Sequence, residues 1–142
     1  MIFVSLTRLR IKSIFSLLPF VFLNERAVKQ VVRSPGFLGG RLLVDGRRTF
    51  WTVTAWESEA AMKGYRGSGA HREAMPKLPG WCDEAAVAHW TQESPEIPDW
   101  RALWQRLSQN PRMSPVKQPS EAHSAKRFSE PRTTVQRTLK KA

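Results

Sequence analysis

A two-residue turn signal between two apolar segments is the feature that most constrains this chain. Asp45-Gly46 separates Phe37–Val44 from Arg48–Trp56. The tightest hairpin turns need positive φ at both central residues, which an Asp-Gly pair tolerates well. The pattern therefore predicts two paired antiparallel strands, and the other segments must be arranged around them.

Two further segments have the composition of strands. Residues 1–11 and 82–91 carry apolar side chains at both odd and even positions, which is typical of strands covered on both faces. Between the first of these strands and the hairpin, residues 20–33 have apolar side chains at helical spacing, and Pro19 stands just before them. Proline is tolerated in the first turn of a helix, so we expect the helix to begin there.

A second helical segment connects the hairpin to the last strand. Ser58 is a predicted N-cap for a helix over residues 59–66, which Gly67-Ser68-Gly69 interrupts before a second piece over residues 70–78. The predicted order is therefore β-α-β-β-α-β. This is the α+β, ferredoxin-like arrangement, with a four-stranded antiparallel sheet.

The last third of the chain divides into a helix and a polar tail. Asp99 is a predicted cap for a helix with an apolar stripe, which makes residues 99–109 a docking helix at the end of a domain that spans residues 1–109. Residues 110–142 contribute +6 of the net charge of +11 and are rich in Pro, Ser, Thr and Gln. Such a composition predicts a basic, disordered tail.

The strands predict a partner. Helices would cover one face of a four-stranded sheet and leave the other open, although the strands are apolar on both faces. Large uncovered apolar surfaces are rare, so we expect a second copy to cover this one and to form a homodimer through the open sheet face.

Charge and cysteine content exclude several classes of protein. The single cysteine, Cys82, permits no intrachain disulfide and no zinc site. The basic residues Arg8, Arg10 and Lys12 precede an apolar segment of about ten residues, too short to span a bilayer, and no cleavage pattern follows it. We therefore predict a cytoplasmic protein. Neither specific nucleic-acid binding nor membrane contact is favoured.

Four short blocks resemble a known group of proteins: Phe50–Trp56, Gly67–Pro76, Trp81–Glu84 and His89-Trp90. They are similar to the dimeric α+β barrel proteins related to antibiotic-biosynthesis monooxygenases, and within that group to the branch of spheroidene monooxygenase-like and uncharacterised bacterial proteins. The resemblance covers roughly residues 1–93. It implies a pocket between sheet and helices for an apolar molecule that is aromatic, polyketide-like or carotenoid-like.

The resemblance leaves the cofactor open between none and haem. Cofactor-free members oxidise substrates that can activate dioxygen themselves, whereas haem-degrading members use a helix histidine as iron ligand. In this chain Met75 stands at the place of that histidine, and His71 lies one turn earlier.

His71 is the predicted catalytic residue. It shares a helix face with Met75 and Leu78, so we expect it to point toward the sheet, where a neutral imidazole could bind iron or act as a general base. The alternative is a structural histidine held by a backbone carbonyl. Other candidates for binding the molecule are Trp51, Trp56, Met75, Trp90, Ser5 and Thr7.

Each of these ligand-binding candidates also has a structural interpretation. Alternation puts Trp51 and Trp56 on opposite faces of their strand, so both can also be core residues.

In the last predicted strand, alternation sends the neighbouring carboxylates of Asp83 and Glu84 apart, which argues against an acid-base pair. It also separates Cys82 from His89, and no set of residues predicts a metal site.

Two functions follow from the sequence. The favoured one is an oxidoreductase, a monooxygenase-like protein that acts on or binds an apolar small molecule. The alternative is a non-catalytic dimeric module that binds a ligand or a partner protein.

Overall fold

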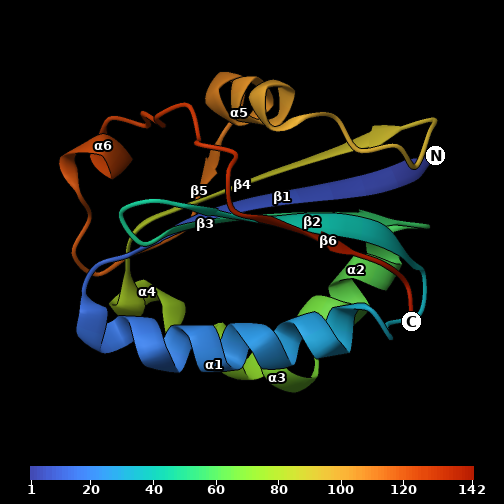
Figure 1. The fold of residues 1–142 in the computed structure, drawn as a ribbon, viewed down its shortest axis with the longest axis horizontal. Coiled ribbons are helices and arrows are strands. Elements are labelled where there is room, and N and C mark those ends of the chain that lie inside the picture. Colours follow the sequence, from blue (N-terminus) through green and yellow to red (C-terminus); the bar gives the residue numbers. More distant parts are fainter.

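A six-stranded antiparallel sheet with helices on both faces forms the protein (Figure 1). The computed structural model describes all residues, 1–142. Along the sheet the strands follow the order β5-β4-β1-β3-β2-β6. The elements are β1 (Ile2–Ile11), α1 (Ile14–Val31), β2 (Phe37–Asp45), β3 (Thr49–Trp56), α2 (Glu59–Arg66), α3 (Gly69–Ala74), α4 (Leu78–Trp81), β4 (Cys82–Gln92), α5 (Trp100–Gln109), β5 (Arg112–Met113), α6 (Glu121–Ser124) and β6 (Gln136–Leu139).

The α+β ferredoxin-like class is confirmed, but the predicted number of strands is wrong. Four strands are those expected, with β1 at the centre between β3 and β4. The two additional strands come from the polar tail: β5 pairs with β4, and β6 pairs with β2. Backbone groups at a sheet edge can pair with any extended segment, whatever its side chains, so composition gave no sign of them.

The hairpin forms, but its turn differs from the predicted one. Asp45 pairs with Thr49, which leaves a three-residue loop of residues 46–48. Positive φ angles occur at Arg47 and Arg48, 62° and 59°, instead of at Asp45 and Gly46. The turn signal therefore located the hairpin correctly and its register incorrectly.

The first helices show both where local signals succeed and where they fail. Helix α2 has the predicted bounds, and the Oγ of its N-cap Ser58 accepts a hydrogen bond from the Ala61 N–H at 3.1 Å. Helix α1, in contrast, begins at Ile14, so that Pro19 lies inside it. The second piece predicted over residues 70–78 is split into α3 and α4 on either side of Pro76, because proline has no N–H to continue the helical hydrogen bonds, although Met75 before it keeps a helical conformation.

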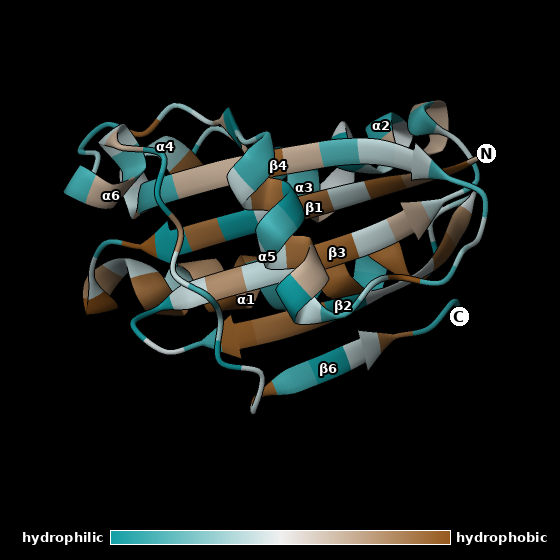
Figure 2. Ribbon diagram, turned by 90° about the horizontal axis from the view of Figure 1, so that it is seen from above, coloured by the Kyte–Doolittle hydropathy of each residue, from teal (hydrophilic) through white to brown (hydrophobic).

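The second face of the sheet is not open. Helix α5 crosses it (Figure 2), capped by Asp99, whose Oδ1 accepts from the Ala102 N–H at 2.8 Å. An 11-residue apolar cluster fills this side, and we call it the α5-face core. Its members are Val4, Leu6, Leu43, Trp51, Val53, Ala86, Ala88, Trp100, Leu103, Leu107 and Phe128.

The expectation of an uncovered face is therefore wrong, because the apolar stripe of α5 meets the apolar sheet of its own chain. Trp100 is 3% exposed, and Leu103 and Leu107 are fully buried. The homodimer itself stays a prediction, but the surface assigned to it is occupied.

The tail lies on the domain. Residues Gln136–Leu139 pair with β2, and the last residue donates its N–H to the Val32 carbonyl at 2.9 Å. Phe128 and Leu139 are 8% and 3% exposed. Composition predicted disorder because the tail has few apolar residues, but two of those few are buried. No helix of the chain is both long enough and apolar enough to pass through a bilayer.

Candidate functional site

The side of the sheet that α1 to α4 cover, which we call the helix face, has apolar ends and a polar middle. One cluster packs α1 and α2 against one end, with Phe3, Phe37 and Trp56 at its centre. A second cluster, with Ile11 and Phe20, closes the other end. Between the two clusters lies a row of polar side chains that we call the polar band: Ser5, Thr7, Thr52, Thr54 and His89.

Strand register brings the polar band together. Ser5 of β1 lies opposite Thr54 of β3 on one side and opposite His89 of β4 on the other, and Thr7 lies opposite Thr52. Side chains that are opposite in neighbouring strands have Cβ atoms about 5 Å apart. The band therefore presents hydroxyl groups and an imidazole on one continuous patch of three adjacent strands.

The polar band is incompletely covered, although its strands are in the middle of the sheet. Thr7, Thr52 and His89 are part-exposed, while Ser5 and Thr54 are 9% and 7% exposed. Within the band, Thr54 has a side-chain partner, because its Oγ1 accepts from the Trp56 Nε1 at 2.8 Å. Buried polar groups normally have partners, so the other hydroxyls are available to water or to a ligand.

His89 connects the band to a cavity at the edge of the sheet. The cavity has a volume of about 300 Å³ and is lined by Val87, Ala88, His89, Asn110, Pro111 and Arg112. The ring of His89 lies 5.2 Å from that of Phe3. Burial lowers the pKa of His89, and the positive charges of Arg112 and Arg66 lower it further. The imidazole is therefore neutral near pH 7 and can accept a proton.

His71, the catalytic candidate from the sequence, lies elsewhere. Its Nδ1 is 3.2 Å from the Arg66 carbonyl oxygen, and its ring contacts Tyr65 at 4.9 Å between centroids. Tyr65 in turn stacks on Trp56. Burial lowers the pKa of His71, partly offset by the bond to Arg66. The side chain fills the junction of α1, α2 and α3, the backbone-bound arrangement that was the alternative.

The remaining sequence candidates divide between the two faces. Trp56 lies on the helix face with Ser5 and Thr7. Trp51 and Trp90 lie on the other face, where Trp51 is fully buried and Trp90 packs against the α5-face core. The opposite directions expected for Trp51 and Trp56 are confirmed.

Met75 does not join any of these groups. It is 43% exposed at the end of α3, on the outside of the helix layer. The split of the expected helix at Pro76 removes the shared face with Leu78 on which its assignment depended. Alternation along a strand was thus a reliable guide to direction, whereas helical spacing across a proline was not.

A haem held through the predicted helix residues does not fit this arrangement. His71 uses one ring nitrogen on a backbone carbonyl and places its ring against Tyr65. Met75 faces the outside. An axial ligand must present a nitrogen or sulfur atom toward an open space at the sheet. Nε2 of His71 is left for such a role, but its ring packs into the helix layer against Tyr65, and the Met75 side chain points outward.

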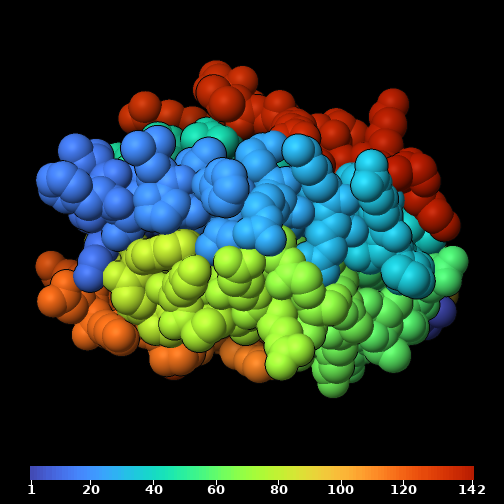
Figure 3. Space-filling view, turned by 90° about the horizontal axis from the view of Figure 1, so that it is seen from below, coloured from blue at the N-terminus to red at the C-terminus, as the bar shows by residue number.

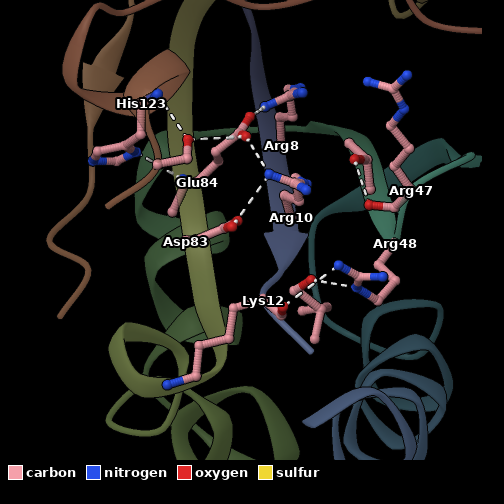
Figure 4. Close-up of polar contacts among 12 residues, drawn as sticks. Arg8, Arg10, Lys12, Arg47, Arg48, Asp83, Glu84 and His123 are labelled. Carbon is pink, nitrogen blue, oxygen red and sulfur yellow. Dashed lines mark hydrogen bonds and ion pairs between the residues drawn. The ribbon is translucent and has the colours of Figure 1, made fainter. Parts of the chain in front are cut away.

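A second polar cluster lies on the α5 face (Figure 4), and the sequence did not reveal it. Arg8 NH1 donates to Glu84 Oε1 at 2.7 Å, and both side chains are less than 8% exposed. Arg10 NH1 binds Asp83 Oδ2 at 3.2 Å and Glu84 Oε2 at 3.0 Å. The cation of Arg8 also lies 5.5 Å from the ring centroids of Trp51 and Phe128.

A β-bulge explains why alternation failed here. The register between β1 and β4 shifts at Arg10/Ile11, so that Arg10 pairs with Glu84 and Ile11 with Cys82. The extra residue, Asp83, breaks the alternation. The two carboxylates that were expected to diverge therefore share Arg10. Cys82 joins the helix-side cluster, the face that His89 also occupies, and burial raises its pKa to about 12.

The same cluster holds the tail, and we call it the tail latch. Ser120 Oγ donates to Glu84 Oε2 at 3.0 Å, and the Ala85 N–H donates to His123 Nδ1 at 3.2 Å. Burial would raise the pKa of Glu84, but hydrogen bonds and charge from Arg8, with bonds from Arg10 and Ser120, lower it overall. A buried carboxylate fully engaged by two arginines is a structural group, not an acid or a base for catalysis.

Comparison with known proteins agrees with the fold. Residues 21–77 match the family described as antibiotic biosynthesis monooxygenase. No curated protein matches the chain. Similar solved structures include Rv0793 from Mycobacterium tuberculosis, with 11% identity, a TM-score of 0.58, and coverage of 66% of this chain and 97% of that one.

Two further structures have similar statistics. SnoaB of Streptomyces nogalater, described as a cofactor-independent oxygenase, is 13% identical with a TM-score of 0.53, and the match covers 69% of this chain and 98% of SnoaB. A conserved protein from Methanosarcina mazei is 11% identical with a TM-score of 0.58, covering 66% and 94% of the two chains. About a third of this chain has no counterpart in these smaller proteins.

Proposed function

Because residues 21–77 match the antibiotic biosynthesis monooxygenase family and the chain has the fold of that superfamily, we propose that it is an oxygenase of an apolar small molecule. The substrate would lie between the helix layer and the polar band. Suitable substrates are aromatic, polyketide-like or carotenoid-like molecules with a hydroxyl or carbonyl group. In this proposal the chain acts without a haem bound to His71.

The observation that supports this location is the incomplete cover of the polar band. A sheet centre beneath a helix layer is normally filled by apolar side chains, as both ends of this face are. Here hydroxyls and an imidazole occupy the centre and stay partly accessible. Apolar walls with a few converging polar groups are typical of small-molecule sites.

The roles of the residues follow from their chemistry. Neutral His89 would remove a proton from an activated CH₂ group or a phenol of the substrate. The hydroxyls of Ser5 and Thr7 would donate hydrogen bonds to the oxygen on which the negative charge develops. Trp56, fully buried on the same face against Phe37 and Tyr65, would fix the position of Thr54 through its Nε1 hydrogen bond.

The reaction is balanced without another reductant. The deprotonated, electron-rich substrate gives its electrons to dioxygen. One oxygen atom replaces two hydrogens of the CH₂ group to form a carbonyl, and the other oxygen leaves as water with those hydrogens. The resemblance to a cofactor-independent oxygenase supports this chemistry over one that needs a bound redox group.

Oxygen uptake with a panel of anthrone-type substrates, which have an activated CH₂ group, tests the proposal. We expect uptake that His89→Asn and Ser5→Ala each reduce by about 100-fold. The matched control is His123→Asn in the tail latch, which should retain the rate. His71→Asn separates the two histidines, because it should also retain the rate unless the sequence-based assignment of the base is right.

The pH profile gives an independent readout. Because the pKa of His89 lies below that of a free imidazole, the decline of the rate on the acidic side should occur at a lower pH than a free imidazole would give. The acidic limb should disappear in His89→Asn. Uptake that is absent across the panel, or unchanged in His89→Asn, would refute the assignment.

A non-catalytic ligand-binding module is the second candidate. It is favoured by the fixed position of His71, because the histidine that was predicted to be catalytic then does not reach the polar band. The two functions differ experimentally: ligand-induced stabilisation that Thr7→Val weakens, together with a flat oxygen trace, would establish binding alone.

A further inference from the structure

Helix α1 has an apolar outer surface that the fold does not use. Its buried residues, Phe20, Leu23, Ala27, Val28 and Val31, face the sheet and the other helices. On the opposite side, the first nine residues present an exposed apolar stripe, which we call the α1 patch. The members and their exposed fractions are Ile14 64%, Phe15 87%, Leu18 77%, Val21 39% and Phe22 66%.

The patch is a feature of one half of the helix only. Beyond Leu23 the outward positions become charged, with Glu25, Arg26 and Lys29. Figure 3 shows α1 along this side of the molecule, next to α2–α4, with its outer surface toward the viewer. A cluster of exposed phenylalanine and leucine side chains on one helix marks an interaction site.

Basic residues surround the patch from other elements. The β2–β3 turn is tied to the start of α1, because Arg48 Nε donates to the Ile11 carbonyl at 2.9 Å. Helix α4 is tied to the same point, because the Lys12 N–H donates to the Trp81 carbonyl at 2.8 Å. Figure 4 shows Lys12 and Arg48 at this point. The exposed or part-exposed cations at this end are Lys12, Arg47, Arg48, Lys77 and Lys117.

Of the acidic residues at the same end, Asp83 and Glu84 are paired with arginines, whereas Asp45 is bonded to a neutral backbone N–H. Asp45 Oδ1 accepts the Arg132 N–H at 3.1 Å, and Asp83 binds Arg10. Glu84 is buried in the tail latch. The surface around the α1 patch therefore carries a clear excess of positive charge.

We propose that the α1 patch docks the protein on the surface of an anionic lipid bilayer. Apolar side chains of an interfacial helix enter the boundary between headgroups and acyl chains, while flanking lysines and arginines bind anionic headgroups. The patch spans about two and a half turns, roughly 13 Å of helix. That length suits a helix lying in the interface and not one crossing the bilayer.

Charge favours a membrane over a second copy of the chain. In a two-fold contact through the same patch, the basic residues of each copy would meet no free acidic partner, because Glu25 and Glu73 beside the patch are paired with Arg137 and Arg26. Like charges brought together oppose association. An anionic surface instead complements both the apolar patch and its basic surroundings. This inference does not depend on the proposed oxygenase activity.

Vesicle flotation with the full chain tests the inference. We expect binding to vesicles that contain phosphatidylglycerol, little binding to phosphatidylcholine alone, and release as the salt concentration rises. The double variant Phe15→Ser/Phe22→Ser should lower the partition coefficient by at least about tenfold. The control Val135→Ser changes another exposed apolar residue, 58% exposed, and should bind as the unaltered protein does.

The outcomes are distinguishable because the altered side chains are exposed. Thermal unfolding of the double variant should match that of the unaltered protein, so a loss of binding is not a loss of fold. Failure to bind anionic vesicles, or equal binding by the double variant, overturns the inference. It is also overturned if sedimentation shows a dimer that the double variant dissociates, since the patch would then join two copies.

Discussion

Replacing Glu84 by glutamine should strongly destabilise the protein. The side chains of Glu84 and Arg8 are 7% and 6% exposed and 2.7 Å apart. Removing one partner of such a buried pair leaves an uncompensated charge and typically destabilises by about 3–5 kcal/mol. We expect about 3 kcal/mol, the lower end, because the Arg8 cation also contacts two aromatic rings.

Urea unfolding at pH 7 of Glu84→Gln measures this difference, with Glu73→Gln as the control. The Arg26–Glu73 pair has a similar distance, 3.0 Å, but both of its side chains are 46% exposed. An exposed pair contributes less than about 1 kcal/mol. The same chemical change should therefore have a large effect at one position and a small effect at the other.

The pH dependence of unfolding provides a second measurement. The pKa of Glu84 in the folded state lies below its value in the unfolded state. The stabilisation is therefore fully present above the unfolded pKa and is lost as the pH falls through the folded pKa. Glu84→Gln should lack this acid-dependent loss. A variant within about 1 kcal/mol of the unaltered protein at pH 7 would refute the buried network.

Three further substitutions or deletions test the architecture. Leu103→Ala, at a fully buried position of α5, should lower the free energy of unfolding by about 2–5 kcal/mol, whereas the exposed Arg101→Ala should change it little in urea unfolding. Gly36→Ala should destabilise the protein by about 2–3 kcal/mol in thermal unfolding, because φ is +82° and the new Cβ would lie 2.6 Å from that of Ala61. The control Gly64→Ala places its Cβ in open space and should stabilise α2 by about 0.5–1 kcal/mol. Deleting residues 110–142 should lower the free energy of unfolding by about 3 kcal/mol or more, because Phe128 and Leu139 are buried, and an unchanged midpoint would show that the tail contributes nothing.

Much of the fold could be read from local patterns. The caps at Ser58 and Asp99 act within three residues, and the structure has both. Alternation in β1 and β3 correctly separated Trp51 from Trp56, because those strands pair without a bulge between them. These properties depend on neighbours in the chain, which the sequence contains directly.

The candidate site was predicted less well. Ser5, Thr7 and Trp56 were identified from the sequence, and all three lie on the helix face. His89 was set aside, because nothing local shows that it lies opposite Ser5 across a strand pair. His71 was preferred on helical spacing that Pro76 interrupts.

The tail latch shows most clearly what pattern alone does not contain. Arg8 and Arg10 are two residues apart on one strand and share a face, and Asp83 and Glu84 are adjacent on another strand. Their meeting depends on one extra residue in the pairing of β1 with β4. A one-residue shift redirects every following side chain, and only the assembled sheet fixes it.

The amino-acid sequence by itself determined the four main strands, the caps of α2 and α5, and the presence of apolar side chains on both faces of the sheet. The tertiary structure decided what covers the second face. An apolar surface is indifferent to the identity of its partner, because hydrophobic burial is not directional. Helix α5 and the tail cover this face in place of a second copy because the chain connects them to the sheet within reach of it. No local pattern in the sequence contains that information.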